Sequence, residues 1–335
     1  MKDIGNVKHF SEEDLRFATP LNVAKRRAED LKCDTIIDLC SGIGIQAGAF
    51  AKTCKSVFGF ELDKRKVEVS KKNFSLVKNL EFEAGDVLDN DIIEKVKKIK
   101  PEVIFCDPER LPSEKERNLD SIKPDLRKLV EIYGKICKNL CIEVPPRIDL
   151  DKLKELGVFE AEYLSLDNKL NRLDLKFGKL RECERSVIDV DSGIKLMNDN
   201  NLQDVKFSEK VLNYLFESSE AILKAGLEKE FADKTLCFIL NGCEKNRLLF
   251  TSNKPIEDDL EIMCKTYIVT GIFNSIEDIN RILRKNSFGK VLIKYAIDPK
   301  DYWKDRNLFE RGLTGDKEGV IFKINNKFVV CEDYY

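Results

Sequence analysis

The sequence is short of several residue types that common functions require. Its single histidine, His9, and its eleven scattered cysteines, with no CxxC pair, exclude a Cys/His metal cluster. We therefore expect reduced, mostly buried thiols in a reducing compartment. No apolar run approaches the ~20 residues of a membrane span, and the beginning of the chain lacks the apolar stretch of a signal peptide. These absences predict a cytoplasmic protein that does not span a membrane.

An excess of charge of either sign is also missing. The 335 residues include 58 Lys and Arg against 60 Asp and Glu, which gives a formal net charge of −2. Overall charge therefore does not indicate a nucleic-acid partner. Hydrophobic residues make up 42% and charged residues 35%, which is typical of a soluble globular protein. The length is sufficient for two domains.

What the sequence does contain is a regular alternation of apolar strands and helical segments. Thr19-Pro20 predicts the N-cap and first residue of a helical lead-in. Strands are then predicted at "DTIIDLC", "SVFGFELD", "LEFEAGDV", "PEVIFCDP" and "NLCIEVPP", with helices between them. This alternation indicates an α/β fold with a Rossmann-like, doubly wound and mostly parallel sheet. The stretch "EAEYLSLDNKLNRLDLKFG" predicts a terminal antiparallel hairpin.

A change of pattern predicts a second domain. The stretch "VIDVDSGIKLMNDNNLQDVKFSEK" is polar and rich in Asp and Asn, as a boundary would be. Beyond it, helices such as "SIEDINRILRKNSFG" alternate with strands, and "EGVIFKINNKFVVCED" predicts a hairpin that turns at Asn325-Asn326. We predict a first domain of residues 1–190 and a smaller α+β domain of residues 205–335.

The turn after the first strand, "DLCSGIG", has a glycine-rich pattern. A triphosphate-binding loop would need Gly-Lys-Ser/Thr, which is missing, and a dinucleotide fingerprint would need a third glycine where Ala47 stands. In enzymes that bind S-adenosylmethionine (SAM), an acidic residue is followed by small residues and G-x-G. Asp38, Gly42 and Gly44 match this pattern, and Cys40 stands where a glycine is usual.

Three further acidic residues follow the next strands in the matching order. Glu61 would accept hydrogen bonds from both ribose hydroxyls. Asp86, with the backbone amide of Val87, would bind the adenine amine, and Asp107-Pro108 would lie beside the methyl group. The carboxyl ends of parallel strands meet at one edge of a sheet, so these residues predict a SAM site there. We expect no metal.

Each of these features has a structural alternative when taken alone. The glycines could form an ordinary turn. Glu61 could be a surface acid at the end of a strand, Asp86 a helix N-cap, and Asp107 the start of a turn. The predicted cofactor-binding residues are nevertheless Asp38, Cys40, Gly42, Gly44, Glu61, Asp86 and Val87.

Residues 17–190 resemble class I SAM-dependent methyltransferases, through "RFATP", "DLCSGIG", "FELD", "GDV" and "DPER". The whole chain is similar to a group in which this domain is followed by a THUMP-like domain. THUMP domains proper bind RNA, so the resemblance implies an RNA substrate. A weaker likeness runs to trimethylguanosine synthases, which share a Thr-Pro before the first strand.

The residues after the fourth strand bear on the acceptor. Enzymes that methylate base amines carry Asn/Asp-Pro-Pro-aromatic there, and the aromatic is missing from this sequence. Uracil-C5 enzymes have D-P-P-R but also need a cysteine nucleophile, and Cys141 lies inside a strand. Asp107 is predicted to orient the acceptor or take its proton, Glu109 is a second candidate base, and Arg110 would hold a phosphate or a base edge. The predicted catalytic residues are Asp107, Pro108, Glu109 and Arg110.

Local charge favours RNA as a partner. Residues 281–327 contain 12 Lys and Arg but 6 Asp and Glu, a local charge of +6. Tyr302 and Trp303 lie within this stretch as stacking surfaces, unless Trp303 belongs to the core. The leading hypothesis is a methyltransferase of structured RNA, tRNA or rRNA. The alternatives are a methyltransferase of a protein or small molecule, and a SAM-binding RNA-binding protein without turnover. The oligomeric state is left open.

Overall fold

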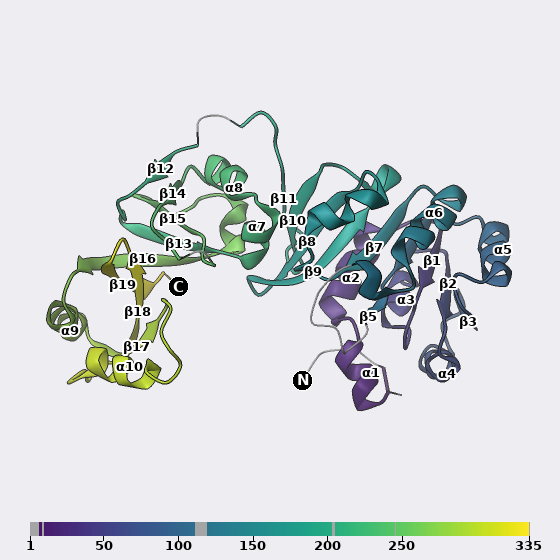
Figure 1. The fold of residues 1–335 in the computed structure, drawn as a ribbon. Coiled ribbons are helices and arrows are strands. Elements are labelled where there is room, and N and C mark those ends of the chain that lie inside the picture. Colours follow the sequence, from purple (N-terminus) through teal and green to yellow (C-terminus); the bar gives the residue numbers. More distant parts are fainter. Residues whose placement is uncertain (1–6, 9, 111–118, 203–204, 245, 335) are drawn as a thin grey trace. The chain divides into compact units, whose positions relative to one another are not determined.

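The computed structural model describes residues 7–8, 10–110, 119–202, 205–244 and 246–334. The chain divides into two compact units. The first comprises residues 1–166 and 170–195, and the second comprises residues 167–169 and 196–335. Figure 1 shows both units.

A nine-stranded sheet organises the first unit, in the order β11-β10-β8-β9-β7-β4-β1-β2-β3. Neighbours among β1, β2, β3, β4 and β7 pair in parallel, as β8 does with β10, whereas β9 is antiparallel to β7. This confirms the predicted α/β, Rossmann-like, mostly parallel sheet. Its strands are β1 (Thr35–Leu39), β2 (Ser56–Glu61), β3 (Leu80–Ala84), β4 (Val103–Cys106), β7 (Leu140–Val144), β8 (Glu160–Leu166), β9 (Lys169–Lys176), β10 (Arg185–Asp189) and β11 (Lys195–Met197).

Helices lie on both faces of this sheet (Figure 1). The main helices are α1 (Glu12–Phe17), α2 (Leu21–Asp30), α3 (Ile45–Phe50), α4 (Lys64–Asn73), α5 (Asn90–Ile99) and α6 (Leu126–Ile136). Two short strands, β5 (Glu109–Arg110) and β6 (Ile122–Lys123), pair with each other. The predicted start of α2 was wrong by one residue, because Pro20 is its N-cap and the helix begins at Leu21.

The apolar character of the central strands explains why they sit between two helical layers. Every residue of β4 and β7 is buried, as expected where helices cover both faces of a parallel sheet. One core cluster joins α2, α3 and α4 to strands β1 to β4. At its centre the rings of Phe50 and Phe105 meet edge to face, with 5.5 Å between centroids.

An eight-stranded sheet organises the second unit, in the order β12-β14-β15-β13-β16-β19-β18-β17. The predicted hairpin is β18–β19, and Asn325 and Asn326 both have positive φ at its turn. The strands are β12 (Phe207–Ser208), β13 (Tyr214–Ser218), β14 (Phe238–Leu240), β15 (Leu249–Ser252), β16 (Cys264–Phe273), β17 (Phe288–Ile293), β18 (Lys317–Ile324) and β19 (Lys327–Asp333). The helices are α7 (Glu220–Ala225), α8 (Glu228–Thr235), α9 (Ile276–Lys285) and α10 (Tyr302–Glu310).

Two expectations from composition can be compared with the structure. All eleven cysteines are free thiols, and most are buried. None of the helices in the described part of the chain has the length and apolar character needed to cross a bilayer.

Candidate functional site

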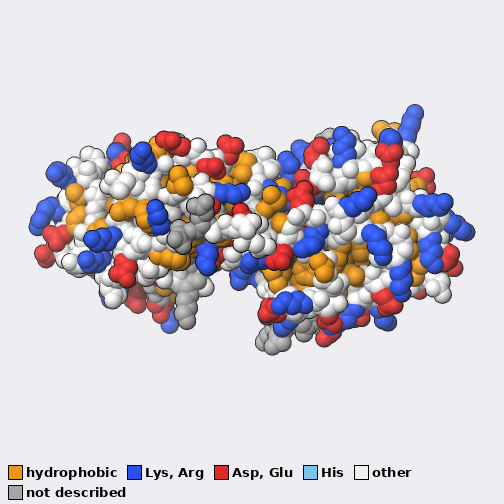
Figure 2. Space-filling view, turned by 90° about the horizontal axis from the view of Figure 1, so that it is seen from above, with side chains coloured by type: hydrophobic (Ala, Val, Ile, Leu, Met, Phe, Trp, Pro, Cys, Tyr) orange, Lys and Arg blue, Asp and Glu red, His pale blue; other side chains and the backbone are white. Residues whose placement is uncertain are grey.

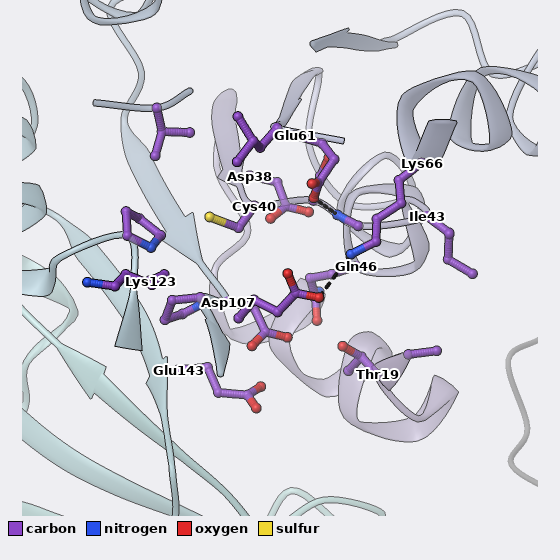
Figure 3. A pocket seen from close by; sticks show the side chains of 18 of the residues that line it. Thr19, Asp38, Cys40, Ile43, Gln46, Glu61, Lys66, Asp107, Lys123 and Glu143 are labelled. Carbon is purple, nitrogen blue, oxygen red and sulfur yellow. Dashed lines mark hydrogen bonds and ion pairs between the residues drawn. The ribbon is translucent and has the colours of Figure 1, made fainter. Parts of the chain in front are cut away.

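A cavity of about 1130 Å³ lies beyond the carboxyl ends of the central strands of the first unit. Open parallel sheets bind ligands at this edge. The predicted site residues line the cavity, with two exceptions. Gly44 does not line it, and the side chain of Arg110 lies outside the described residues. Figure 3 shows Asp38, Cys40 and Glu61 in one part of the cavity and Asp107 with Glu143 in another.

Asp38, near the end of β1, is a buried acid whose oxygens accept no hydrogen bond of good geometry from the described residues. It is 1% exposed, and neither carboxylate oxygen has a hydrogen-bond partner among the described residues. Burial and the nearby negative charges of Asp107 and Glu61 hold its pKa well above the usual range, although Arg27 and the backbone amide of Ala47 act in the opposite direction. A buried carboxylate without a donor is costly. The arrangement therefore suits a ligand that brings a cationic hydrogen-bond donor.

The loop after β1 has three residues with a left-handed backbone. Cys40, Gly42 and Gly44 have φ values of 64°, 56° and 86°. A Cβ at Gly44 would lie 2.7 Å from the ring of Phe82, so a side chain cannot fit there. Cys40 has the conformation that glycine adopts without cost, which explains why glycine is usual at this position. The loop keeps the backbone turn that the sequence pattern predicted.

Glu61 connects this loop to the end of β2. One carboxylate oxygen accepts a hydrogen bond from the amide of Gly42 at 2.8 Å, and the other accepts from the amide of Asp63 at 3.0 Å. The side chain is buried rather than a surface acid. Carboxylate oxygens have further lone pairs, so Glu61 can still accept hydrogen bonds from a ligand.

The turn after β3 holds Asp86 and Val87 at the cavity. Asp86 accepts a hydrogen bond from the amide of Leu88 at 2.8 Å, and the carbonyl of Val87 accepts from the hydroxyl of Tyr133 at 2.5 Å. The alternative of an N-cap does not apply, because α5 is capped at Asp89. Asp86 thus shapes the turn and also faces the cavity.

Asp107 follows β4 and faces the cavity without a partner in the described part of the chain, and no dashed line reaches it in Figure 3. Burial, then the charge of Glu143, raises the pKa of Asp107 to about 7, against the opposing charges of Arg27 and Arg172. The next acid, Glu109, is 61% exposed and pairs with Lys66 at 3.0 Å. The structure therefore distinguishes a half-buried candidate base that faces the cavity from an exposed one that is already paired.

Sequence reasoning missed the charged residues beneath Asp107. Arg27 on α2 is 2% exposed and binds both Asp174 and Glu143. Arg172 on β9 lines the cavity and approaches Glu143 at 2.9 Å. The available signal was Glu143 itself, an acid inside the otherwise apolar stretch "LCIEV". Such an acid must be paired or functional, because an isolated buried charge is strongly unfavourable.

This chain is similar to known methyltransferases in sequence family and in fold. Residues 33–177 match the family model described as RNA cap guanine-N2 methyltransferase. Over 98% of this chain, the fold matches 84% of a protein of Porphyromonas gingivalis W83 that is assigned provisionally as a methyltransferase, with 15% identity and a TM-score of 0.79. A SAM-dependent methyltransferase of Clostridium acetobutylicum ATCC 824 is 16% identical over 39% of this chain and 52% of its own, with a TM-score of 0.30.

The family match over residues 33–177 and the fold of the first unit are those of a SAM-dependent methyltransferase. The predicted enzyme class and cofactor are thereby confirmed, and SAM is the methyl donor. The predicted resemblance to class I methyltransferases holds for the first unit.

Proposed function

We propose that this protein transfers a methyl group from SAM to structured RNA, either tRNA or rRNA. The observation that carries the RNA substrate is the family match over residues 33–177, whose description names an RNA methyltransferase. Residues 1–190 would perform the chemistry and residues 205–335, as a THUMP-like domain, would position the RNA. A cytoplasmic location belongs to the same proposal.

The residues of the cavity fit the donor. SAM, when bound, supplies a methyl group made electrophilic by a positively charged sulfur. Asp38 would hold the ammonium group, which would give its two buried oxygens the cationic partner that they lack. Glu61 would accept from the ribose hydroxyls, Asp86 would accept from the adenine amine, and the amide of Val87 would donate to a ring nitrogen of the adenine. The left-handed backbone at Cys40, Gly42 and Gly44 would let the loop approach the donor closely.

Asp107 would orient the acceptor and take its proton. It faces the cavity from the end of β4, and a carboxylate with a pKa near neutrality is a suitable base at physiological pH. Glu109 remains a second candidate base, but its exposed carboxylate is already paired with Lys66. Pro108 fixes the backbone between the two acids, and Arg110 would hold a phosphate or a base edge.

The methylated atom is left open in this proposal. The family description names the N2 amine of a guanine. Glu109, however, occupies the position at which base-amine enzymes carry a proline. Digestion of the methylated RNA to nucleosides would identify the atom.

The charged rim of the cavity supports an RNA acceptor. Lys123 and Lys128 are exposed and line the part of the cavity near Asp125. Lysines in such positions bind phosphates. A small-molecule acceptor would favour a closed, apolar cleft, whereas the rim of this cavity carries exposed lysines. A binder without turnover would have a pocket blocked near Glu109, but that side chain is 61% exposed.

The second unit supports the same substrate. Trp303 on α10 is 65% exposed, so it lies on the surface rather than in the core, and Arg306 lies over its ring at 5.3 Å. An exposed aromatic beside arginine suits stacking on a nucleic-acid base. Figure 2 shows Lys and Arg side chains interspersed with acidic ones over the visible face. RNA binding would therefore use local basic groups rather than a uniformly positive surface.

The test uses purified protein, tritiated SAM and total RNA from a strain that lacks the gene. Wild type and Asp107→Ala are compared, with protein extract as a second acceptor. Asp34→Asn is the matched control, because Asp34 is an exposed acid that pairs with Lys55 away from the cavity. The proposal expects label in RNA with wild type and the control but not with Asp107→Ala. Label in protein alone, or in neither acceptor, would contradict it.

A further inference from the structure

Three carboxylates stand side by side across the centre of the first sheet. Strand β4 pairs in parallel with β7, with Cys106 opposite Ile142, so the next residues, Asp107 and Glu143, are neighbours. Strand β7 pairs antiparallel with β9, with Glu143 opposite Asp174. Residues paired in this way present their side chains on the same face. Asp107, Glu143 and Asp174 therefore form a row, which we call the acidic row.

Two arginines hold two members of the acidic row. Arg27 Nε and Nη2 donate to the two oxygens of Asp174 at 2.8 and 2.6 Å, and Nη2 also donates to Glu143 at 2.6 Å. Arg172 Nε lies 2.9 Å from the other oxygen of Glu143. Glu143 thus lies between two guanidinium groups, with a hydrogen bond from Arg27 and an ion pair with Arg172.

Asp107 differs from the other two members of the row. It has no hydrogen-bond or ion-pair partner among the described residues, and its carboxylate faces the cavity. The acidic row has three carboxylates, and only two guanidinium groups pair with it. The unpaired carboxylate is that of Asp107, which an acceptor can reach from the cavity. The row therefore has two members paired with arginine, Glu143 and Asp174, and one end, Asp107, that faces the cavity.

We propose that Glu143 and Arg172 are positioning residues for methyl transfer, placing one negative and one positive charge beside Asp107, the member of the acidic row that faces the acceptor. This inference rests on the proposed role of Asp107 as base. The acceptor's lone pair would form the new bond to the methyl carbon. The carbon–sulfur bond would break with its electrons left on sulfur, and Asp107 would take the proton lost by the acceptor and release it to solvent.

The surroundings of Asp107 determine which substitutions can test this. The neighbouring charges have opposite effects, since Glu143 and Asp174 favour its neutral form and Arg27 and Arg172 favour its charged form. Glu109 and its partner Lys66 stand two residues further along at the cavity. The titratable and charged groups around Asp107 are Asp38 on β1, Cys106 on β4, Glu143 on β7, Arg172 and Asp174 on β9, and Arg27 on α2.

A network that only stabilised the fold would behave differently. Buried ion pairs are frequently neutral for stability, and breaking one lowers stability without a specific effect on a neighbour's titration. Replacing Glu143 and Arg172 one at a time should instead move the titration of Asp107 in opposite directions. Loss of stability alone cannot produce two shifts of opposite sign.

The experiment measures the carboxyl ¹³C shift of Asp107 against pH in protein labelled at aspartate, with Asp107→Asn to assign the signal. Glu143→Gln is expected to lower the midpoint by about 1 pH unit, and Arg172→Gln to raise it by about the same amount. Arg172→Lys should restore the wild-type midpoint. Glu162→Gln is the control, because Glu162 is an equally buried acid paired with Lys176 away from the cavity. The acid limb of kcat/KM should move with these midpoints.

The outcomes separate the inference from the proposed function. Unchanged midpoints in both Glu143→Gln and Arg172→Gln, or shifts of the same sign, would overturn the inference. The titration needs no acceptor, so it decides the inference even if no methylated RNA is found. If Glu143→Gln does not fold, Arg172→Gln and Arg172→Lys still test the inference. The side chain of Arg172 is partly exposed, so these variants should fold. Full activity of Asp107→Asn would instead overturn the role of Asp107 as base.

Discussion

The backbone amide of Gly42 donates a hydrogen bond of 2.8 Å to Glu61, which ties the loop after β1 to the end of β2. The second oxygen of the same carboxylate accepts from the amide of Asp63. The acid proposed to bind the ribose thus also fixes the loop proposed to receive the rest of the donor. Substitutions can separate these two roles, because an amide side chain keeps one acceptor oxygen but has no charge.

We predict that Glu61→Gln keeps the loop but weakens donor binding. The glutamine oxygen can still accept from Gly42, but its NH2 group would face the N–H of Asp63, so the free energy of unfolding should fall by about 1 kcal/mol. Affinity for S-adenosylhomocysteine (SAH), measured by calorimetry, should fall roughly tenfold, since hydrogen bonds to a charged acceptor are stronger than neutral ones. Glu61→Ala should also lose about 1–3 kcal/mol of stability, because it leaves buried amides without an acceptor.

The control for this pair is Glu81→Gln, a change of an exposed acid on β3. It should leave both stability and SAH affinity as in wild type. Wild-type SAH affinity in Glu61→Ala would remove Glu61 from the proposed donor site.

Asp38→Asn is predicted to stabilise the free protein while it removes donor binding. The pKa of Asp38 is raised in the folded state, so the folded protein holds a proton that the unfolded chain has already released. Stability contributed by this group is therefore present at low pH and lost as the pH rises through the folded pKa. Asparagine has no charge to bury, so the variant should gain about 1–3 kcal/mol at pH 8 and little at pH 4.

Denaturant titrations at pH 4 and pH 8, with SAH calorimetry at pH 8, measure both effects. SAH affinity should fall at least tenfold, because the ammonium group loses its carboxylate partner. A variant that is less stable than wild type at pH 8 would mean that Asp38 has a donor in solution. A variant that binds SAH normally would place the ammonium group elsewhere.

Cys40→Gly is predicted to be tolerated, whereas Cys40→Val is not. Cys40 has a φ of 64°, which glycine adopts freely and β-branched residues avoid. Thermal unfolding should show the glycine variant within about 1 kcal/mol of wild type, and the valine variant less stable by about 1–3 kcal/mol. Equal stability of the two variants would show that the loop relaxes to another backbone conformation. Gly42→Ala tests the cost of the left-handed backbone by itself. The φ of Gly42 is also positive, at 56°, and a Cβ there would meet no neighbour.

The sequence was sufficient to predict that the acids proposed to bind the donor line one cavity. The acids at 38, 61, 86 and 107 each stand at or just beyond the end of an apolar strand, and parallel strands bring their carboxyl ends to one edge. Local pattern and topology together therefore predicted which residues meet. They also predicted the β18–β19 hairpin, because two asparagines at a turn favour positive φ.

The acidic row and its arginines could not be predicted in this way. Arg27 and Asp174 are 147 residues apart, and each resembles an ordinary charged residue of an amphipathic helix or strand. Only the tertiary packing of α2 on the sheet shows that the arginine is buried. Strands β12 to β15 were also missed, since they are 2–5 residues long and lack a clear alternation.

Trp303→Ala is predicted to weaken RNA binding without affecting the fold or the donor site. Stacking of a base on an aromatic side chain contributes about 1–3 kcal/mol, so RNA affinity should fall by roughly 5- to 150-fold. The side chain is 65% exposed, so thermal stability should change little. Filter binding with total tRNA and SAH calorimetry measure the two sites separately.

Leu308→Ala is the matched control for this prediction. Leu308 lies on the same helix, α10, and is also exposed, but a leucine cannot stack on a base as an aromatic ring does. It should leave RNA affinity unchanged, whereas Arg306→Lys should lower it, because an ammonium group lacks the planar face that lies over Trp303. Equal losses in Trp303→Ala and Leu308→Ala would indicate a general apolar contact instead of base stacking. No loss in either variant would place the RNA contacts on other residues of the chain.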